Sequence, residues 1–290
     1  MRFGISLPPF GEYSDVRYLA EAARRAEAAG WDGFFIWDHV VFDPSFHPVP
    51  DTWAALTAIA LSTTRIRIGS LVTPIARRRP WILARQTVTV DHASNGRLTL
   101  GVGLGDPMFD FGLFGEQTDP RVRAQLLDEG LAVLTGLWSG ESFSFEGKHH
   151  SVGEVRFRPV PVQSPRIPIW AGGQWPNPRP LRRAAGLDGY FPIKLDGDLT
   201  PEHWRDIVAR LGALRTADDP FDLVHPGQIG EDQWDRADDI IGPLADLGVT
   251  WWMENVSPWR FGHPWEVQWS PDFTRAMDEI IDRGPPRYRA

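Results

Sequence analysis

Short apolar runs alternate with amphipathic stretches along the first third of the chain. Apolar residues that run together or alternate with polar ones predict strands at residues 3–7, 33–37, 66–72 and about 98–102. Apolar residues at helical spacing predict helices between Asp15 and Gly30 and over residues 52–62 and 81–93. This alternation indicates parallel strands that are covered by helices and joined by right-handed crossovers.

The same alternation resumes after Pro165. The pattern predicts strands at residues 167–171, 190–193, 221–224 and 249–253, and helices after Pro178 and over residues 201–214 and 271–282. The helix before the last strand is interrupted by Pro243, which predicts a kink or a restart. Eight strands paired with eight helices are typical of an α/β fold of the (β/α)8 barrel type, and a doubly wound open sheet is the alternative.

The repeat is broken between Pro107 and Pro165. A long loop leads to a predicted helix at about residues 121–138, and residues 143–157 alternate like a hairpin with its turn near Gly147. We therefore expect a single domain over residues 1–290 that carries an insertion after the fourth strand, at about residues 107–165.

Composition and charge narrow the possible functions. With 290 residues, 42% of them hydrophobic, the chain can bury roughly 75% of its unfolded surface in one core. The absence of cysteine excludes disulfides, thiolate metal sites and cysteine nucleophiles. A net charge of −8 argues against a nucleic-acid partner. Because the N-terminal residues contain no long apolar run, we expect neither a signal peptide nor a membrane span, and a cytoplasmic protein.

The ends of two strands carry titratable residues. In a (β/α)8 barrel the chemistry lies at the carboxyl ends of the strands, and the second strand ends in Asp38 and His39. A histidine exchanges protons near neutral pH, and Asp38 could orient its ring or bind a ligand. The alternative is structural, with Asp38 satisfying loop amides. Asp106, after the fourth strand, is a second candidate acid or base, or a helix cap.

Glycine residues lie at the end of the fourth strand, and mainly apolar residues lie at the end of the third. Gly103 and Gly105 remove Cβ atoms where a loop leaves the fourth strand, so a large planar ligand could approach the main chain there. A tight bend is the alternative explanation. The third strand ends in Ser70, Leu71 and Val72, which could support one face of a flat ring or simply pack in the core.

The fifth strand leads through Ala171, Gly172 and Gly173 into a helix that carries Arg179 and two further arginines. Bare backbone amides at the start of a helix, with arginine nearby, form a candidate phosphate site. An arginine face exposed to solvent is the alternative. Several tryptophans also fall near predicted strand ends and predict an aromatic pocket: Trp37, Trp170, Trp175, Trp251, Trp252 and Trp259.

Five segments carry a family resemblance. They are the opening strand, GWDGFFIWDHV, RIRIGSLVTP, the run RRRPWILARQTVTVDHASNGRLTLGVGLG, and PIWAGG. Together they resemble the bacterial luciferase-like flavin-dependent oxidoreductases, over a stretch from Met1 to about Met253. The resemblance implies a luciferase-like TIM barrel that binds reduced FMN or the deazaflavin coenzyme F420 at the strand ends.

The resemblance also implies roles for individual residues. Family members that use F420 carry an Asp-His pair after the second strand, which matches Asp38 and His39; the aspartate touches the ring system and the histidine transfers a proton or stabilises an intermediate. A non-proline cis peptide after the third strand would fall within residues 70–72. Sugar-oxidising F420 enzymes carry an acid near the position of Asp106. The compact segment 107–165 argues against long-chain aldehyde chemistry.

The residues leave the cofactor and the reaction open. Arg77, Arg78 and Arg79 could receive an oligoglutamate tail, which slightly favours F420 over FMN. The cofactor could exchange a hydride with a small organic substrate, with His39 as acid or base. It could instead activate dioxygen for monooxygenation, with a flavin reductase as partner. Relatives of the family often dimerise, so a homodimer is a further expectation.

Two hypotheses from other functional classes remain. A glycoside hydrolase on the same barrel would use two carboxylates across a cleft, such as Asp106 and Glu254. A non-catalytic flavin-binding barrel would hold the ring without turnover. We expect no metal centre, because His149 and His150 are adjacent on a predicted strand and point to opposite faces.

Overall fold

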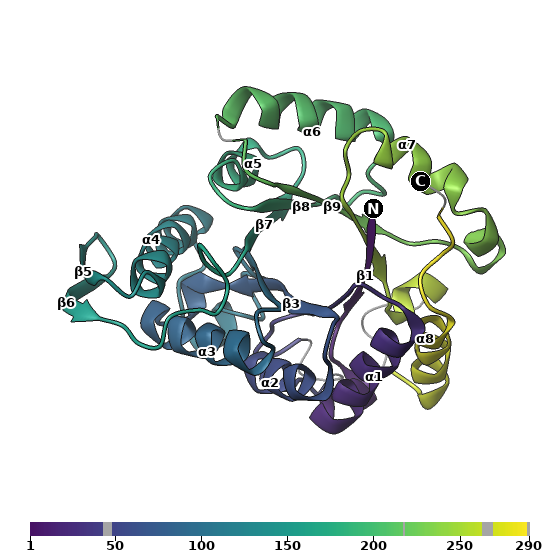
Figure 1. Ribbon diagram of the computed structural model, residues 1–290, viewed down its shortest axis with the longest axis horizontal. Helices are drawn as coiled ribbons and strands as arrows, with labels where there is room; N and C mark the ends of the chain where they lie inside the picture. Colours follow the sequence, from purple (N-terminus) through teal and green to yellow (C-terminus); the bar gives the residue numbers. More distant parts are fainter. Residues whose placement is uncertain (43–47, 217, 263–268, 289–290) are drawn as a thin grey trace.

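The computed structural model describes residues 1–42, 48–216, 218–262 and 269–288. Within these residues, parallel strands close into one barrel in the order β1-β10-β9-β8-β7-β4-β3-β2, surrounded by helices (Figure 1). The barrel strands are β1 (Arg2–Leu7), β2 (Gly33–Ile36), β3 (Arg67–Pro74), β4 (Leu98–Gly103), β7 (Ile169–Gln174), β8 (Gly189–Ile193), β9 (Asp222–Gly227) and β10 (Trp251–Asn255). The closed order confirms the (β/α)8 barrel and excludes the open sheet.

Each barrel strand is followed by a helix in the described part of the chain. The helices are α1 (Val16–Ala29), α2 (Thr52–Ser62), α3 (Pro80–Ala93), α4 (Pro120–Trp138), α5 (Pro178–Ala184), α6 (Pro201–Leu214), α7 (Asp238–Ala245) and α8 (Pro271–Arg283). Asp15 caps α1 by accepting a hydrogen bond from the Arg17 amide, and Gly30 ends this helix with a φ of +97°. Pro243 lies inside α7, a short helix that follows the 3-10 turn η4 (Glu231–Arg236) and continues past the proline to Ala245, so the helix does not restart at Pro243.

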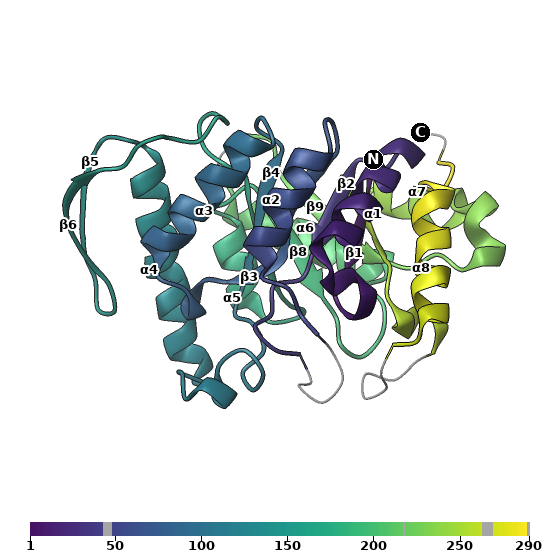
Figure 2. The same ribbon diagram turned by 90° about the horizontal axis from the view of Figure 1, so that it is seen from below.

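Segment 107–165 contains a loop, α4 and the antiparallel ribbon of β5 (Ser142–Glu146) and β6 (Ser151–Arg156). Helix α4 packs beside α3 and connects β4 to β7, so it takes the place of a crossover helix. The ribbon lies outside α4 (Figure 2). Its turn is held by the Glu129 carboxylate, which accepts hydrogen bonds from the amides of Lys148, His149 and His150 at 2.9 Å. The two histidines therefore lie in this turn and not on a strand.

Aromatic and aliphatic side chains fill the inside of the barrel. Phe35, Trp170, Trp251 and Met253 meet there, and the rings of Phe35 and Trp170 stack with their centroids 5.1 Å apart. A larger apolar layer lies between the strands and the surrounding helices. Because the interior is packed, as in other barrels of this type, a ligand must bind at the mouth, where the strands end.

Candidate functional site

A cavity of about 470 Å³ lies at the mouth of the barrel, at the carboxyl ends of β2, β3, β4, β7 and β8. This volume lies within the ~300–1,000 Å³ usual for small-molecule sites. All but three of the predicted site residues line it: Asp38, His39, Leu71, Val72, Gly103, Gly105, Asp106, Gly172 and Gly173. The carboxyl ends of the parallel strands meet at this mouth, so residues from segments that are far apart in the sequence lie close together there.

The three exceptions lie outside the cavity. Ser70 is fully buried, and its hydroxyl donates to the carbonyl of Gly101 at 3.3 Å. Ala171 is buried and does not line the cavity. Arg179 is exposed on α5, outside this cavity, and its amide is already bonded to Asn177 Oδ1 at 3.1 Å. Since the neighbouring Pro178 and Pro180 have no N–H, the start of α5 does not supply the expected free amides.

Val72 forms the apolar floor of the cavity between two glycines. A Cβ atom on Gly103 would lie 2.6 Å from Cγ2 of Val72, and one on Gly172 would lie 2.6 Å from Cγ1. The peptide bond between Leu71 and Val72 is cis, as expected for residues 70–72. The two glycines therefore make room for the Val72 side chain, a packing role, while their backbones line the cavity.

Gly105 shapes the rim in a similar way. Its φ of +72° lies in the left-handed region, and a Cβ atom there would come within 2.7 Å of Pro74 and 3.1 Å of Asp110 Oδ2. The tight-bend explanation therefore holds at this position. The bend directs the following residue inward, so that the amide of Asp106 donates to Asp110 Oδ2 at 3.0 Å.

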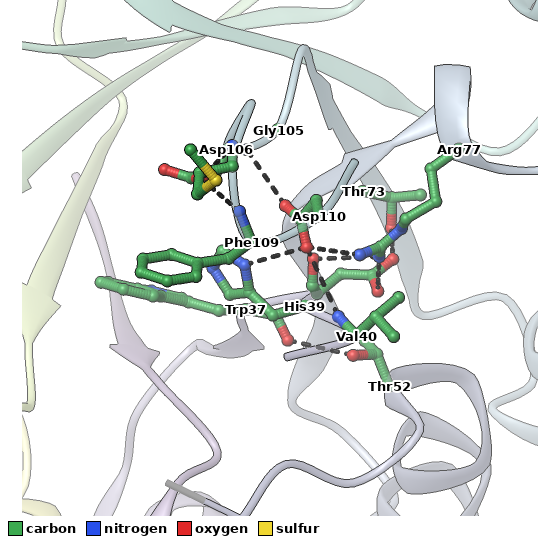
Figure 3. Close-up of polar contacts among 12 residues, drawn as sticks. Trp37, His39, Val40, Thr52, Thr73, Arg77, Gly105, Asp106, Phe109 and Asp110 are labelled. Atoms are coloured by element: carbon green, nitrogen blue, oxygen red, sulfur yellow. Dashed lines mark hydrogen bonds and ion pairs between the residues drawn. The ribbon is translucent and has the colours of Figure 1, made fainter. Parts of the chain in front are cut away.

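His39 is held at the cavity edge by Asp110. Its Nδ1 lies 3.2 Å from Asp110 Oδ1, and the same oxygen accepts a hydrogen bond from Arg77 Nη1 at 2.6 Å (Figure 3). The Asp110 side chain is fully buried, whereas that of His39 is 15% exposed. Burial raises the pKa of Asp110, but the hydrogen bond from His39 and the charges of His39 and Arg77 outweigh it, and the pKa is lowered. Asp110 is therefore ionised.

Asp38 lies at the cavity wall with both carboxylate oxygens engaged. Oδ1 accepts hydrogen bonds from Arg77 Nη2 at 2.5 Å and from Arg78 Nη2 at 2.7 Å. Oδ2 accepts one from the Thr73 hydroxyl at 2.8 Å. The side chain of Asp38 is 1% exposed. Asp38 thus anchors the two arginines behind the cavity, a structural role that differs from the bonding of loop amides considered from the sequence.

This pairing contradicts the expectation that Arg77 and Arg78 receive an anionic tail. Arg77 bridges Asp38 and Asp110, and its side chain is only 5% exposed. Arg78 is 17% exposed and bonded to Asp38. Both guanidinium groups are committed to carboxylates within the protein, while Arg79 lies exposed at the start of α3.

Asp106 and Glu254 do not face each other across the cavity. Asp106 lines it, and Oδ1 accepts hydrogen bonds from the amides of Met108 and Phe109 at 2.8 Å each, as a cap does. Glu254 is fully buried away from the cavity and accepts hydrogen bonds from Trp252 Nε1 at 2.7 Å and Arg260 Nη1 at 2.9 Å. Burial raises the pKa of Glu254. The carboxylate pair needed by a glycoside hydrolase is therefore not assembled here.

The aromatic contribution to the cavity is smaller than the sequence suggests. Trp37 lines the cavity and stacks on Trp259, with centroids 5.3 Å apart and planes at 22°. Trp170, Trp251 and Trp252 are instead buried in the core, where they pack against other apolar side chains.

Sequence reasoning missed several residues of the cavity. Arg123 is buried, and its Nη1 donates to the carbonyls of Leu104 and Gly105 at 2.9 and 3.0 Å, which fixes the rim loop. Asp110 and Arg123 fall in segment 107–165, outside the repeating pattern. Neither residue directly follows a predicted barrel strand, so the sequence offers no reason to place them at the cavity. Asn177 and Ile193 also line the cavity, together with Arg183, which is one of the arginines considered for the phosphate site.

The family model of luciferase-like monooxygenases matches residues 1–224. The chain belongs to this family. An F420-dependent glucose-6-phosphate dehydrogenase from Microbacterium testaceum is 32% identical over 172 residues, which cover 57% of this chain and 49% of that protein. This agrees with the resemblance drawn from the sequence motifs.

Solved structures share the fold. The coenzyme F420-dependent tetrahydromethanopterin reductase from Methanopyrus kandleri is 18% identical, covers 98% of both chains and has a TM-score of 0.73. The oxygenating constituent of 3,6-diketocamphane monooxygenase from Pseudomonas putida, in complex with FMN, is 16% identical, covers 100% of this chain and 91% of its own, and has a TM-score of 0.62. Proteins that share this fold therefore include ones that use F420 and ones that bind FMN.

Two features are absent from the described residues. No helix among them is long and apolar enough to cross a membrane. No group of three or more His, Asp or Glu side chains among them is placed to hold a metal ion.

Proposed function

We propose that this protein is an F420-dependent oxidoreductase that transfers a hydride between the deazaflavin ring and a small organic substrate at the barrel mouth. The observation that carries this proposal is the position of His39, fixed by buried Asp110 at the edge of a cavity with an apolar floor. Membership of the luciferase-like family and the 32% sequence identity to an F420-dependent glucose-6-phosphate dehydrogenase support this proposal.

The residues present fit a flat, amphipathic ring. Leu71 and Val72 offer an apolar floor, and Trp37 and Ile193 offer apolar walls. A small number of polar side chains, among them His39, Asn177 and Arg183, line the same cavity. Sites for drug-sized ligands have this composition, mostly apolar with a few placed polar groups. When bound, the cofactor supplies the hydride chemistry, and the protein supplies position and protons.

His39 is the group that would exchange a proton with the substrate. Asp110 engages Nδ1, so Nε2 is the nitrogen left for a substrate oxygen. The ionised Asp110 fixes the orientation of the His39 ring, as a buried carboxylate does beside other catalytic histidines. Arg77 shares Oδ1 of Asp110 with His39 and holds this carboxylate in place.

A second candidate is flavin-dependent monooxygenation with reduced FMN. The shared fold of the FMN-bound 3,6-diketocamphane monooxygenase constituent favours this candidate. Here His39 and the apolar floor would exclude water from the reacting atoms, and a separate flavin reductase would deliver the reduced cofactor. The same cavity serves both candidates, so the cofactor itself must be tested.

The deciding experiment is a titration of the purified protein with F420 and FMN, each oxidised and reduced, followed by tryptophan fluorescence. Trp37 lines the cavity, so ring binding should quench its emission, and Trp37→Phe identifies the part of the signal that comes from this site. We expect tight binding of F420. Preferential binding of reduced FMN would favour the monooxygenase, and a lack of binding by either cofactor would overturn both candidates.

A further inference from the structure

A second hollow of about 510 Å³ lies beside the mouth cavity, between α4 and α5. Four arginines line it: Arg121 of α4 and Arg179, Arg182 and Arg183 of α5. Figure 1 shows both helices on the same side of the barrel, and α5 packs against strand β7. This local concentration of positive charge stands out in a chain with a net charge of −8. We call this hollow the arginine groove.

Most of the positive charge in the arginine groove is unpaired within the described residues. Arg183 Nε donates to Asp128 Oδ1 at 2.6 Å, and Asp128 itself is 59% exposed. The side chains of Arg121, Arg179 and Arg182 form no ion pair with any described residue. Like charges gathered on one surface repel one another and focus a field that attracts anions. The groove is therefore suited to an anion with several negative groups.

The ribbon turn adds two basic groups at the outer end of the groove. Gln125 of α4 lines the groove, and its Oε1 accepts a hydrogen bond from Lys148 Nζ at 3.2 Å and lies 2.9 Å from His149 Nε2. Glu129 holds this turn against α4 through three backbone amides, so these groups have a fixed position. Basic side chains thus follow one another along the groove away from the mouth.

The groove adjoins the mouth cavity. Arg183 lines both, and the cavity residues Pro120 and Asn177 are close in the chain to Arg121 and Arg179 of the groove. A ligand with its ring on Val72 can therefore pass Arg183 and continue over α5. A single phosphate close to the ring would occupy only the Arg183 end, whereas a chain of carboxylates would reach the other arginines.

We propose that the arginine groove binds the oligoglutamate tail of F420, with Arg179 and Arg182 as its principal contacts. This inference rests on the proposed function, and it assigns to α5 the tail contact that is not available to Arg77 and Arg78, which are paired with the buried Asp38. Exposed ion pairs contribute little each, so several must act together for the tail to matter. Affinity should then rise with the number of glutamates and fall with added salt.

The test compares three ligands: F420 with a long tail, F420 with one glutamate, and the deazariboflavin fragment that lacks phosphate and tail. Dissociation constants are measured by tryptophan quenching for the wild type and for the double variant Arg179→Gln/Arg182→Gln. Both arginines are exposed and make no ion pair with described residues, so the variant should keep its fold. We expect the variant to bind long-tailed F420 roughly 3- to 30-fold more weakly, with unchanged affinity for the fragment.

The matched control is Arg17→Gln/Arg275→Gln, which removes the same charge from exposed positions on α1 and α8. It should leave all three affinities unchanged. Equal affinities of the wild type for long and short tails, or an equal loss in the control, would overturn the groove assignment while leaving ring binding intact. Failure of the wild type to bind any of the three ligands would overturn the proposed function as well.

Discussion

The Nδ1 atom of His39 lies 3.2 Å from Oδ1 of Asp110, across 71 residues of sequence. The histidine follows β2, and the aspartate lies in the loop between β4 and α4. A buried carboxylate at this place gives the ring one orientation, which leaves Nε2 as the nitrogen available to a ligand. The pair therefore joins the predicted strand-end histidine to a residue from outside the repeating unit.

Replacement of His39 by alanine should lower turnover by about 10²–10⁴-fold, the usual contribution of a placed acid or base. Cofactor affinity should change much less, because the floor at Leu71 and Val72 is untouched. Steady-state rates and fluorescence titrations on the same preparation separate the two effects. Substitution of the exposed His92 is the control, and turnover of H39A equal to that of wild type would remove His39 from the proposed mechanism.

Arg77 should matter more for stability than its neighbour Arg78. Arg77→Met leaves Asp38 and Asp110 as two buried carboxylates without their shared counter-ion, which should cost about 3–5 kcal/mol of unfolding free energy. Arg78 is less buried and bonds only Asp38, so Arg78→Met should cost clearly less. Urea unfolding of both variants measures the difference. Equal losses would mean that the bridge between the two carboxylates is not what makes Arg77 important.

His225 should make the fold sensitive to mild acid. This side chain is buried against Trp204, whose Nε1 donates to His225 Nδ1 at 2.8 Å, and burial lowers its pKa to about 3. The unfolded chain binds a proton near pH 6.5, whereas the folded protein does not, so His225 lowers stability as the pH falls from about 6.5 towards 3.

In His225→Gln, the amide oxygen can still accept the hydrogen bond from Trp204, and no group titrates. Urea unfolding at a series of pH values should give a flatter decline below about pH 6.5 than in the wild type. Substitution of the exposed His92 by glutamine should leave the wild-type slope. If H225Q and the wild type lose stability with the same slope, groups other than His225 cause the loss of unfolding free energy in acid.

Most of the fold follows from local patterns. Parallel strands covered on both faces are continuously apolar, as in residues 33–36, and each is separated from the next by a helix-length segment. That regularity predicts the barrel, and the strand-end rule then places Asp38 and His39 at its mouth. These steps need only sequence spacing, because strand and helix periods are properties of neighbouring residues.

The electrostatics of the site could not be predicted in this way. Three consecutive arginines, Arg77 to Arg79, resemble an exposed basic run in the sequence. Only the tertiary fold shows that two of them form ion pairs with Asp38 and Asp110. Conversely, the arginine groove joins residues of α4 and α5, and α4 lay in the segment interpreted as an insertion. Whether a cation is paired or free depends on contacts between distant segments, which have no local signal.

Gly103 offers a direct test of the cavity floor. Gly103→Ala places a methyl group 2.6 Å from Cγ2 of Val72, so the valine must move, and overpacking of this kind costs about 1–3 kcal/mol. Cofactor affinity should fall together with stability, because Val72 lines the cavity. Since the clash is with the Val72 side chain, the second change Val72→Ala should restore much of the stability.

Gly212→Ala on α6, where a Cβ atom meets nothing within 4 Å, is the control. Urea unfolding and cofactor titration of the single and double variants check this, and a double variant as unstable as G103A would mean that the glycine serves the backbone and not Val72.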